Sequence, residues 1–342
     1  MKGYAFPGGR EVAFVEKPTP SPGPGQVLIK SGTSSICGSD LHGYRASKDE
    51  RAPYAETFSG HEPVGEVTAV GEGVTWPTVG ERVVVYHVGG CGDCRYCRER
   101  DYKACHAATD PQNSMTFGRD GSNAEYVLAP VGQVLPLPED FSFPEGSVLS
   151  CNFGTAWGAV RNAFSFPNGT VVVWGLGPVG LNIILIAQAL GAEIIGVDIS
   201  EGRRRVAEKF GATVVDGSRP DVVDAVHALA GGEGPEAIID TTGVGSVHAL
   251  LVSAIRRRGT IVLVGLGHET SVGPVPVAIL KQVTIKGSWL YDIEDWQDML
   301  DFVRRHEIDL LATVDKVVPI AQFETMLEEA DAALSGKIIF SW

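Results

Sequence analysis

Residues 171–180 read VVVWGLGPVG, and this stretch decides the fold of the second half of the chain. Four apolar residues predict a buried strand, glycines follow with the spacing GxGxxG, and a helical stretch begins behind them. Such a turn lets a pyrophosphate reach the helix N-terminus, where free N–H groups and the helix dipole favour an anion. The sequence therefore predicts a dinucleotide-binding turn at Gly175, Gly177, Pro178, Val179 and Gly180.

The next apolar run, Ile194–Val197, ends in Asp198, at the spacing expected for an acid that hydrogen-bonds the adenosine ribose hydroxyls. A carboxylate at this position would repel a 2′-phosphate, so Asp198 favours NAD over NADP. Arg203 and Arg204 follow closely, and arginines in this region can accept that phosphate. NAD is the predicted cofactor, and NADP is the alternative that the two arginines support.

Outward from this turn, two patterns divide the chain. From Thr170, apolar strands alternate with helical stretches, which predicts a parallel sheet built from βαβ units. Before about residue 150, short alternating strands are separated by turn-rich segments such as PTPSPGPG at 18–25, which predicts an antiparallel β-domain. The tail from Tyr291 predicts a helix, an extended segment at 316–318, a helix over 321–335 and a final strand at 337–340.

The composition excludes several classes of protein. A chain of 342 residues has room for two cores, and its 44% hydrophobic and 20% charged residues are ordinary for a globular protein. The net charge of -14 argues against a nucleic-acid partner, because phosphate binding needs clustered Lys and Arg. The most apolar stretch, 181–195, is interrupted by polar residues, so it cannot span a bilayer. Because the N-terminus lacks the pattern of a signal peptide, we expect a cytoplasmic protein with reduced cysteines.

Four of the six cysteines fall within fifteen residues, in the segment CGDCRYCRERDYKAC. Four thiolates this close together are typical of a closed, tetrahedral structural Zn²⁺ site. An iron–sulfur cluster is the alternative, but its fourth cysteine follows after three residues and precedes Pro, whereas here seven residues intervene and His106 follows. Disulfides would require an oxidising compartment. The predicted ligands of the structural zinc are Cys91, Cys94, Cys97 and Cys105.

The remaining cysteines, Cys37 and Cys151, are far apart in the sequence, and His61 lies between them in a Gly-His-Glu segment. Two thiolates and one imidazole would make three protein ligands for Zn²⁺ and leave a fourth position open, which is the arrangement of a catalytic site. Singly, each residue has a simpler explanation as a buried thiol or a hydrogen-bonded histidine. Together they assign every cysteine of the chain to a metal.

The sequence resembles the zinc-containing medium-chain alcohol dehydrogenases over nearly its whole length. The resemblance is carried by CGSDLH from Cys37, GHEPVGEV from Gly60, the cysteine loop, GLGPVG from Gly175 and SGKIIF from Ser335. It implies an α/β protein with a GroES-like catalytic β-domain at 1–151 and an inserted Rossmann NAD-binding domain, a doubly wound parallel sheet, at 152–290. The segment 291–342 would complete the catalytic domain.

The resemblance also implies roles for single residues. Cys37, His61 and Cys151 would bind the catalytic zinc, with Glu62 behind the metal and Asp40 orienting His61, as carboxylates around metal sites do. The resemblance thus implies two zinc ions per chain, together with NAD.

Other implied roles concern the proton, the cofactor and the substrate. Ser39 would begin a proton relay, and His42 would stand near its solvent end. Further cofactor contacts are implied for Thr155, Val179, Arg203, Val264, Leu266 and Ser288. His87 and Trp289 correspond to positions that line the substrate cleft in members of the family.

The implied reaction is hydride transfer between a primary or secondary alcohol and NAD, giving an aldehyde or ketone. Gly38 and Phe340 stand where many members carry arginines that bind the pyrophosphate; Gly38 is common in polyol-type members, whereas Cys151 resembles alcohol-type members. A polyol, sugar or threonine-type dehydrogenase is therefore the alternative. A non-catalytic NAD-binding protein would be expected to have lost the catalytic-zinc residues, and all are present. We expect a small alcohol or carbonyl substrate, no nucleic-acid or membrane partner, and a homo-oligomer, either dimer or tetramer.

Overall fold

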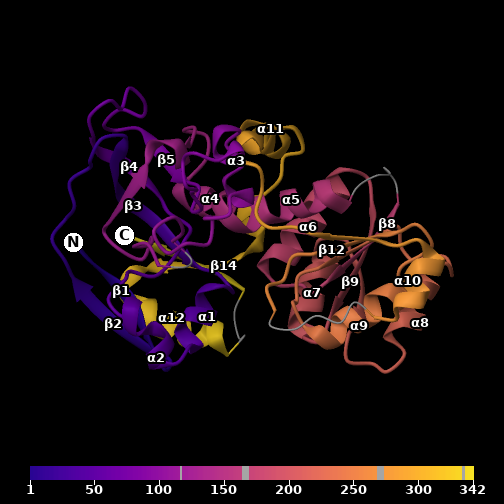
Figure 1. Cartoon of the computed structure of the whole chain (residues 1–342). Coiled ribbons are helices and arrows are strands. Elements are labelled where there is room, and N and C mark those ends of the chain that lie inside the picture. The colour runs from indigo at the N-terminus through magenta and orange to yellow at the C-terminus, as the bar shows by residue number, and fades with distance from the viewer. Residues whose placement is uncertain (116–117, 164–168, 268–272, 333–335) are drawn as a thin grey trace. The chain divides into compact units, whose positions relative to one another are not determined.

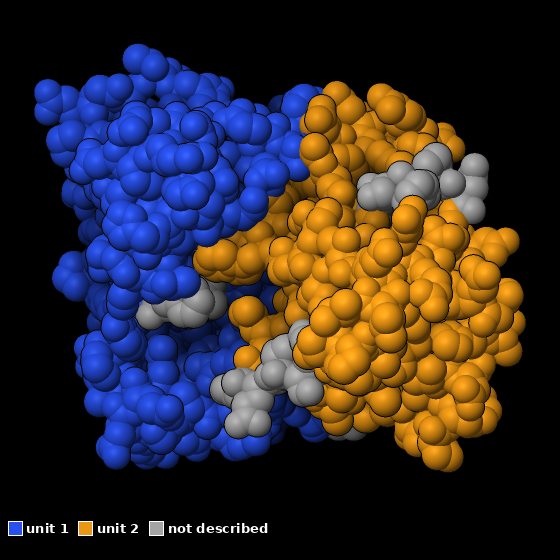
Figure 2. Space-filling view, turned by 45° about the vertical axis from the view of Figure 1, so that its right-hand side comes forward, with its two compact units in different colours: residues 1–151, 292–297, 309–342 blue, residues 152–291, 298–308 orange. Residues whose placement is uncertain are grey.

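The computed structural model describes residues 1–115, 118–163, 169–267, 273–332 and 336–342. It divides into two compact units, which Figure 2 colours separately. Unit 1 comprises Met1–Cys151, Asp292–Gln297 and Asp309–Trp342. Unit 2 comprises Asn152–Tyr291 and Asp298–Ile308. The chain therefore passes from unit 1 into unit 2 twice and returns to unit 1 each time.

Unit 2 contains one parallel sheet of six strands, in the order β10-β9-β8-β11-β12-β13. Its strands are β8 (Thr170–Trp174), β9 (Glu193–Asp198), β10 (Thr213–Asp216), β11 (Ala237–Asp240), β12 (Thr260–Leu263) and β13 (Thr284–Gly287). Its helices are α5 (Gly154–Ala163), α6 (Pro178–Ala189), α7 (Glu201–Lys209), α8 (Val222–Leu229), α9 (Gly245–Ala254), α10 (Val275–Lys281) and α11 (Trp296–Arg305), whose first two residues belong to unit 1. The order reverses beside β8, which is the arrangement of a doubly wound, dinucleotide-binding sheet.

The central strands of this sheet are apolar except at their ends, because both of their faces are buried. Side chains of β8, β9, β11 and β12 form one core with those of α8 and α9. The prediction of a parallel α/β sheet in this half of the chain is confirmed.

Unit 1 is built on an antiparallel sheet, drawn mainly in indigo and purple in Figure 1, to which the yellow C-terminal strands are added. The strands of this sheet are β3 (Gln26–Ile36), β4 (Val64–Val70), β5 (Arg82–Val85), β6 (Tyr126–Pro130), β7 (Val134–Pro136), β14 (Val314–Pro319) and β15 (Lys337–Ser341). A separate two-stranded sheet is formed by β1 (Lys2–Gly8) and β2 (Glu11–Glu16). The α-helices of unit 1 are α1 (Asp40–Arg45), α2 (Lys48–Arg51), α3 (Arg95–Arg98), α4 (Phe143–Val148) and α12 (Phe323–Asp331). Short 3-10 helices cover Ala52–Tyr54, Tyr102–Ala104, Val131–Gln133, Ile293–Asp295, Leu310–Thr313 and Ile320–Gln322.

The last strand, β15, pairs antiparallel with β3 and parallel with β14. It therefore brings the C-terminal residues beside the strand that precedes Cys37. The helix predicted over 321–335 is observed as α12, which ends at Asp331; residues 333–335 lie outside the described part of the chain.

Part of the C-terminal segment lies elsewhere than predicted. The predicted boundary at residue 291 assigned everything after it to the first domain, whereas the compact units place Asp298–Ile308 in unit 2. The cause is the apolar face of α11, on which Met299, Leu300 and Phe302 are buried. The rings of Phe302 and Trp157, on α5, meet edge to face with centroids 5.1 Å apart.

Candidate metal centres and cofactor turn

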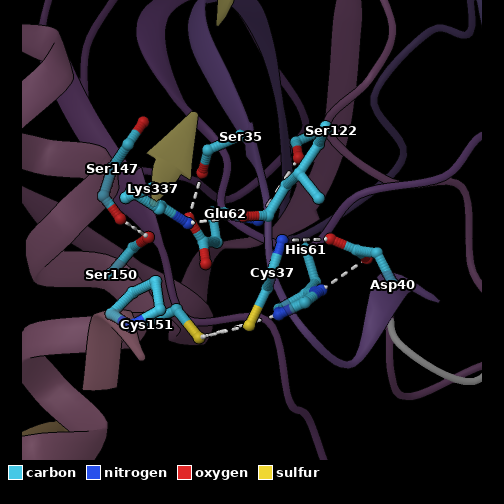
Figure 3. A network of polar contacts seen from close by, with 12 residues as sticks. Ser35, Cys37, Asp40, His61, Glu62, Ser122, Ser147, Ser150, Cys151 and Lys337 are labelled. Atoms are coloured by element: carbon cyan, nitrogen blue, oxygen red, sulfur yellow. Dashed lines mark hydrogen bonds and ion pairs between the residues drawn. The ribbon is translucent and has the colours of Figure 1, made fainter. Parts of the chain in front are cut away.

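Four residues of unit 1 form one cluster of metal-ligand atoms: Cys37, His61, Glu62 and Cys151, whose donor atoms all lie within 4.8 Å of one another. The two sulfur atoms are 3.9 Å apart, and Sγ of Cys151 is 3.6 Å from Nε2 of His61 (Figure 3). A tetrahedral zinc with bonds of about 2.3 Å to sulfur and about 2.0 Å to nitrogen needs edges of about 3.8 and 3.5 Å. The spacing of these three donors fits zinc.

Three separate segments supply the cluster. Cys37 directly follows β3, His61 and Glu62 precede β4, and Cys151 lies in the single π-helical turn Leu149–Phe153. Turns of this kind interrupt α-helices mostly at functional sites, because the extra residue changes the direction of a side chain. Pairing of β3 with β4 holds the first two segments together.

Asp40, the first residue of α1, fixes the orientation of His61. Its Oδ1 accepts a hydrogen bond of 2.9 Å from Nδ1 of His61, and its Oδ2 accepts one of 2.9 Å from the backbone N–H of Cys37. The imidazole therefore presents Nε2 to the sulfur atoms. Burial opposes protonation of His61, but the charge and hydrogen bond of Asp40 outweigh it and raise its pKa.

Glu62 is fully buried behind the cluster, where Figure 3 shows Ser35 and Lys337 converging on it. Its Oε2 accepts hydrogen bonds from Ser35 Oγ and from Nζ of Lys337 on β15. Lys337 is itself buried and also donates to the carbonyl of Ile36 at 3.1 Å. Burial raises the pKa of Glu62, whereas the neighbouring Lys337 lowers it. Oε1 of Glu62 has no hydrogen-bond partner among the described residues.

The sequence predicted no role for Lys337 or for Ser35. Lys337 lies within the motif SGKIIF, and Ser35 lies two residues before the motif CGSDLH. One signal was available for Lys337: a charged residue beginning an apolar final strand. It was not decisive, because the partner carboxylate lies 275 residues earlier in the chain.

The two residues predicted for the proton relay lie at the start of α1. Ser39 is half-buried, and its hydroxyl lies 3.3 Å from Nε2 of His61, on the side that faces the cluster. His42 is exposed, and its backbone N–H bonds to the carbonyl of Ser39. A hydroxyl beside the metal-ligand atoms and an exposed imidazole one turn further along are thus within one short helix.

The second cysteine cluster of unit 1 consists of Cys91, Cys94, Cys97 and Cys105, whose sulfur atoms lie within 4.8 Å of one another. Cys97 Sγ is 3.9 Å from that of Cys91 and 3.6 Å from that of Cys94. None of the six cysteines of the chain forms a disulfide. Four sulfur donors at these distances match the tetrahedral edges of a closed zinc site.

Backbone N–H groups help to stabilise negative charge in this loop. Hydrogen bonds from Asp93 and Cys94 lower the pKa of the Cys91 thiol to about 6, so its thiolate is available near neutral pH. Burial raises the pKa of Cys97 to about 12, so its deprotonation needs a cation nearby. The donor set thus suits a metal that binds thiolates.

In unit 2 the glycine turn has the shape predicted for it. Gly175 has a φ of +95°, and a Cβ there would come within 2.6 Å of Thr241 Oγ1. A Cβ on Gly180 would collide with the carbonyl oxygen of Gly175. Around Gly177 nothing lies within 4 Å of the position of a Cβ, so this residue leaves the backbone open to a ligand at the start of α6.

Asp198 ends β9 and is buried beside this turn. Its Oδ2 accepts from the backbone N–H of Leu176 at 2.8 Å, and its Oδ1 from that of Ser200 at 2.8 Å. Nη1 of Arg203 lies 3.8 Å from Oδ2. Each carboxylate oxygen keeps one further acceptor site, and the neighbouring arginine offsets part of the negative charge.

The other predicted cofactor residues of unit 2 lie on separate elements. Thr155 is buried on α5, Val179 is half-buried at the start of α6, and Leu266 is exposed just beyond β12. Val264 donates its backbone N–H to Asp240 at 2.9 Å. Ser288 donates its N–H to Leu263 and accepts at Oγ from Asn162 at 3.2 Å.

The two predicted substrate-pocket residues belong to different units. His87, in unit 1, is buried, and its ring lies edge-on to that of His61 with centroids 4.8 Å apart. Burial lowers the pKa of His87, which therefore stays neutral. Trp289, in unit 2, is half-buried directly after Ser288. The surroundings of each residue are therefore given within its own unit.

No helix in the described ranges is long and apolar enough to cross a membrane. Two family models match the chain: the alcohol dehydrogenase GroES-like domain at residues 23–139 and the zinc-binding dehydrogenase at residues 178–305.

Among curated proteins, a probable D-xylulose reductase A of Emericella nidulans is 32% identical over 351 residues, covering 99% of this chain and 95% of its own. An alcohol dehydrogenase of Geobacillus stearothermophilus is 29% identical and covers 96% of this chain and 93% of its own. Among solved structures, an Escherichia coli CFT073 alcohol dehydrogenase, rspB, in complex with NADH, is similar with a TM-score of 0.89 and 25% identity. That alignment covers 100% of this chain and 99% of the solved one.

Proposed function

Because the chain belongs to the zinc-binding alcohol dehydrogenase family, we propose that it transfers a hydride between a primary or secondary alcohol and NAD, giving an aldehyde or ketone. The observation that carries this proposal is the spacing of Cys37, His61 and Cys151 at the edges of a zinc tetrahedron. Three protein ligands leave one position for the substrate oxygen, which is the arrangement of a catalytic rather than a structural zinc.

When bound, zinc lowers the pKa of an alcohol hydroxyl and NAD accepts the hydride, and the residues of this chain manage the position and the proton. The Ser39 hydroxyl, beside His61 Nε2, accepts the proton of the substrate hydroxyl as it releases its own proton toward solvent. His42, exposed on the same short helix, passes a proton to solvent. Asp40 keeps the His61 ring turned toward the metal position.

NAD rather than NADP is the cofactor that Asp198 supports, since its carboxylate would repel a 2′-phosphate. Arg203, 3.8 Å from that carboxylate, is the argument for NADP. Complex formation of the E. coli relative with NADH favours NAD.

A polyol is the second candidate substrate, and one specific observation favours it. The ring centroid of His87 lies 4.8 Å from that of His61, so a polar side chain lies beside the metal-ligand cluster. An imidazole can hydrogen-bond a second hydroxyl of the substrate. The E. nidulans relative is named as a xylulose reductase, which agrees with this candidate.

The test is steady-state NAD reduction by the zinc-loaded protein with a panel of primary alcohols, secondary alcohols and polyols. We expect turnover with at least one class, its loss in Cys37→Ser, and its retention in a variant of an exposed pair, Arg205→Gln. A zinc-loaded, NAD-binding protein that oxidises none of the panel and reduces none of the matching carbonyls would contradict the proposal.

A further inference from the structure

Arg119 lies on the segment that follows the cysteine loop, and this segment is fastened to the one that carries His87. The backbone N–H of Arg119 donates to Ser114 at 3.0 Å, and Ser114 forms a β-bridge with Val88. Met115 donates to the carbonyl of His87 at 3.2 Å. All of these residues belong to unit 1.

The guanidinium of Arg119 lacks a counter-ion in the described part of the chain. Its Nη1 donates to Oε1 of Gln133, a neutral amide, at 2.7 Å. Its Nε and Nη2 atoms are shielded from solvent and have no acceptor among the described residues. Burial lowers the pKa of Arg119 to about 10, so the side chain remains a cation at neutral pH. A cation whose unused donor atoms are shielded from solvent is costly to keep unless a ligand pairs with it.

Another arginine of the same unit shows how such a side chain is ordinarily satisfied. Arg82 is half-buried and donates from Nη1 to Pro138 at 3.3 Å and from Nη2 to Phe141 at 2.5 Å, both backbone carbonyls. It also lies over the ring of Phe143. The contrast makes Arg119 the unusual case and Arg82 its matched control.

Two further buried polar atoms near Arg119 have no partner among the described residues. They are Nδ1 of His87 and Nε2 of Gln133, and both side chains are 2% exposed. An amide Nε2 and a guanidinium are donors only. Arg119 and Gln133 Nε2 therefore offer unused donors, which is the complement of a carboxylate.

His87 connects this donor group with the metal-ligand cluster. Its ring centroid lies 4.8 Å from that of His61, and its carbonyl accepts from the backbone N–H of Met115 in the segment that carries Arg119. An alcohol whose oxygen lies beside Cys37 and His61 could thus extend along His87 toward Arg119.

We propose that Arg119 is a specificity residue that binds the carboxylate of the substrate, so that the preferred alcohol is a hydroxy acid or a sugar acid. Arg119 would form charge-assisted hydrogen bonds from Nε and Nη2, and Gln133 would hold the guanidinium group in place. This inference rests on the proposed dehydrogenase function. A phosphate ester would present the same charge, and the test separates the two anions.

The first experiment compares pairs of substrates that differ only in the anion: gluconate with sorbitol, 3-hydroxybutyrate with 1,3-butanediol, and lactate with 1,2-propanediol, together with sorbitol 6-phosphate. We expect kcat/KM to favour a carboxylate over its neutral partner by at least about tenfold, the worth of one charge-assisted bond. Arg119→Met should abolish this ratio, Arg119→Lys should restore part of it, and Arg82→Met should lower the melting temperature while leaving the ratio unchanged.

The second experiment measures binding without turnover. Hexanoate and hexanamide have equal length and lack a hydroxyl, and each is titrated into the zinc-loaded protein with NAD while the melting temperature is followed. We expect hexanoate to stabilise the wild type more than hexanamide does, and this difference to disappear in Arg119→Met alone. A carboxylate preference that survives in Arg119→Met arises at the metal and overturns the proposal.

The outcomes distinguish failure of this inference from failure of the proposed function. Oxidation of neutral alcohols with no preference for carboxylates, or with a preference for the phosphate ester only, overturns the role of Arg119 and leaves the dehydrogenase intact. Absence of all oxidation, with hexanoate still bound through Arg119, contradicts the dehydrogenase and retains the anion site.

Discussion

A lysine ammonium buried at the metal centre shows what single residues contribute to this molecule. Lys337 is 1% exposed, and its Nζ contacts Glu62, which is fully buried. Two opposite charges in the interior are tolerated because each supplies the partner of the other. Ser35 adds a second contact to the same carboxylate oxygen, which holds the side chain of Glu62 behind the cysteines.

Replacing Lys337 should therefore be strongly destabilising. We predict that Lys337→Met lowers the free energy of unfolding by about 3–5 kcal/mol, because the buried carboxylate of Glu62 loses its counter-ion. The double variant Lys337→Met/Glu62→Gln should recover much of this loss, since neither charge remains. Denaturant unfolding measures both. The half-buried pair of Lys316 and Glu329 provides the control, and an equal effect of Lys316→Met would contradict the assignment.

The relay residues make a second prediction at this scale. Ser39→Ala should lower kcat by about 10²-fold with zinc still bound, because the substrate proton loses its first acceptor. His42→Ala should have a milder effect that imidazole buffer partly reverses, since its position is exposed. Ser47→Ala, which removes the cap of α2, is the matched control. Turnover near that of the wild type in Ser39→Ala would exclude the relay.

Asp198, the acid predicted to bind the cofactor ribose, makes a third prediction at this scale. Asp198→Ala should shift the NAD-to-NADP ratio of kcat/KM toward NADP by about 10- to 100-fold, the loss of a hydrogen bond to a charged group. Asp216 ends the neighbouring strand β10 and pairs with Arg204, whose Nη1 also donates to the backbone carbonyl of Asp198, so Asp216→Asn tests whether charge alone is responsible. A wild-type preference for NADP would assign the dominant role to the arginines.

At the scale of elements, short connections after strands position the chemistry. The backbone leaves β3 and turns at once into α1, so Cys37, Ser39 and Asp40 lie within one turn of each other. The four-cysteine loop contains only the four-residue helix α3 and one 3-10 turn. Elements this short are not stable alone, so the loop depends on a bound metal for its structure.

Cys94→Ser should accordingly act on stability. We predict loss of one zinc equivalent and a lower melting temperature, because a structural zinc contributes directly to folding. Cys37→Ser should instead abolish turnover and leave the melting temperature nearly unchanged. Calorimetry with metal analysis distinguishes the two, and equal destabilisation by both variants would show that the clusters do not have separate roles.

Local patterns in the sequence were sufficient for those elements whose contacts are local. The glycine spacing predicted the turn before α6, and the cysteine spacing predicted which four sulfur atoms meet. Lys337 could not be assigned, because its partner Glu62 is 275 residues away and only the pairing of β15 with β3 brings them together. Nor did the sequence show that Asp298–Ile308 would pack in unit 2, since an amphipathic helix fits either core.

At the scale of the whole molecule, the chain builds each unit around its own sheet. Unit 1 contains both cysteine clusters, and unit 2 contains the glycine turn and Asp198. The larger sheet of unit 1 takes its last two strands from the C-terminus, so the cluster that contains Glu62 depends on residues from both ends of the chain. The alternation of strands and helices predicted the parallel sheet of unit 2. The addition of the C-terminal strands to the sheet of unit 1, in contrast, is a property of the complete fold.

The central claim is that the chain binds two zinc ions at two clusters of different kinds. Its most direct test is the metal content of freshly purified protein, measured by inductively coupled plasma mass spectrometry on the wild type, Cys37→Ser and Cys94→Ser. We predict close to two equivalents of zinc in the wild type and close to one in each variant. Iron in place of zinc, or a single equivalent in the wild type, would contradict the account.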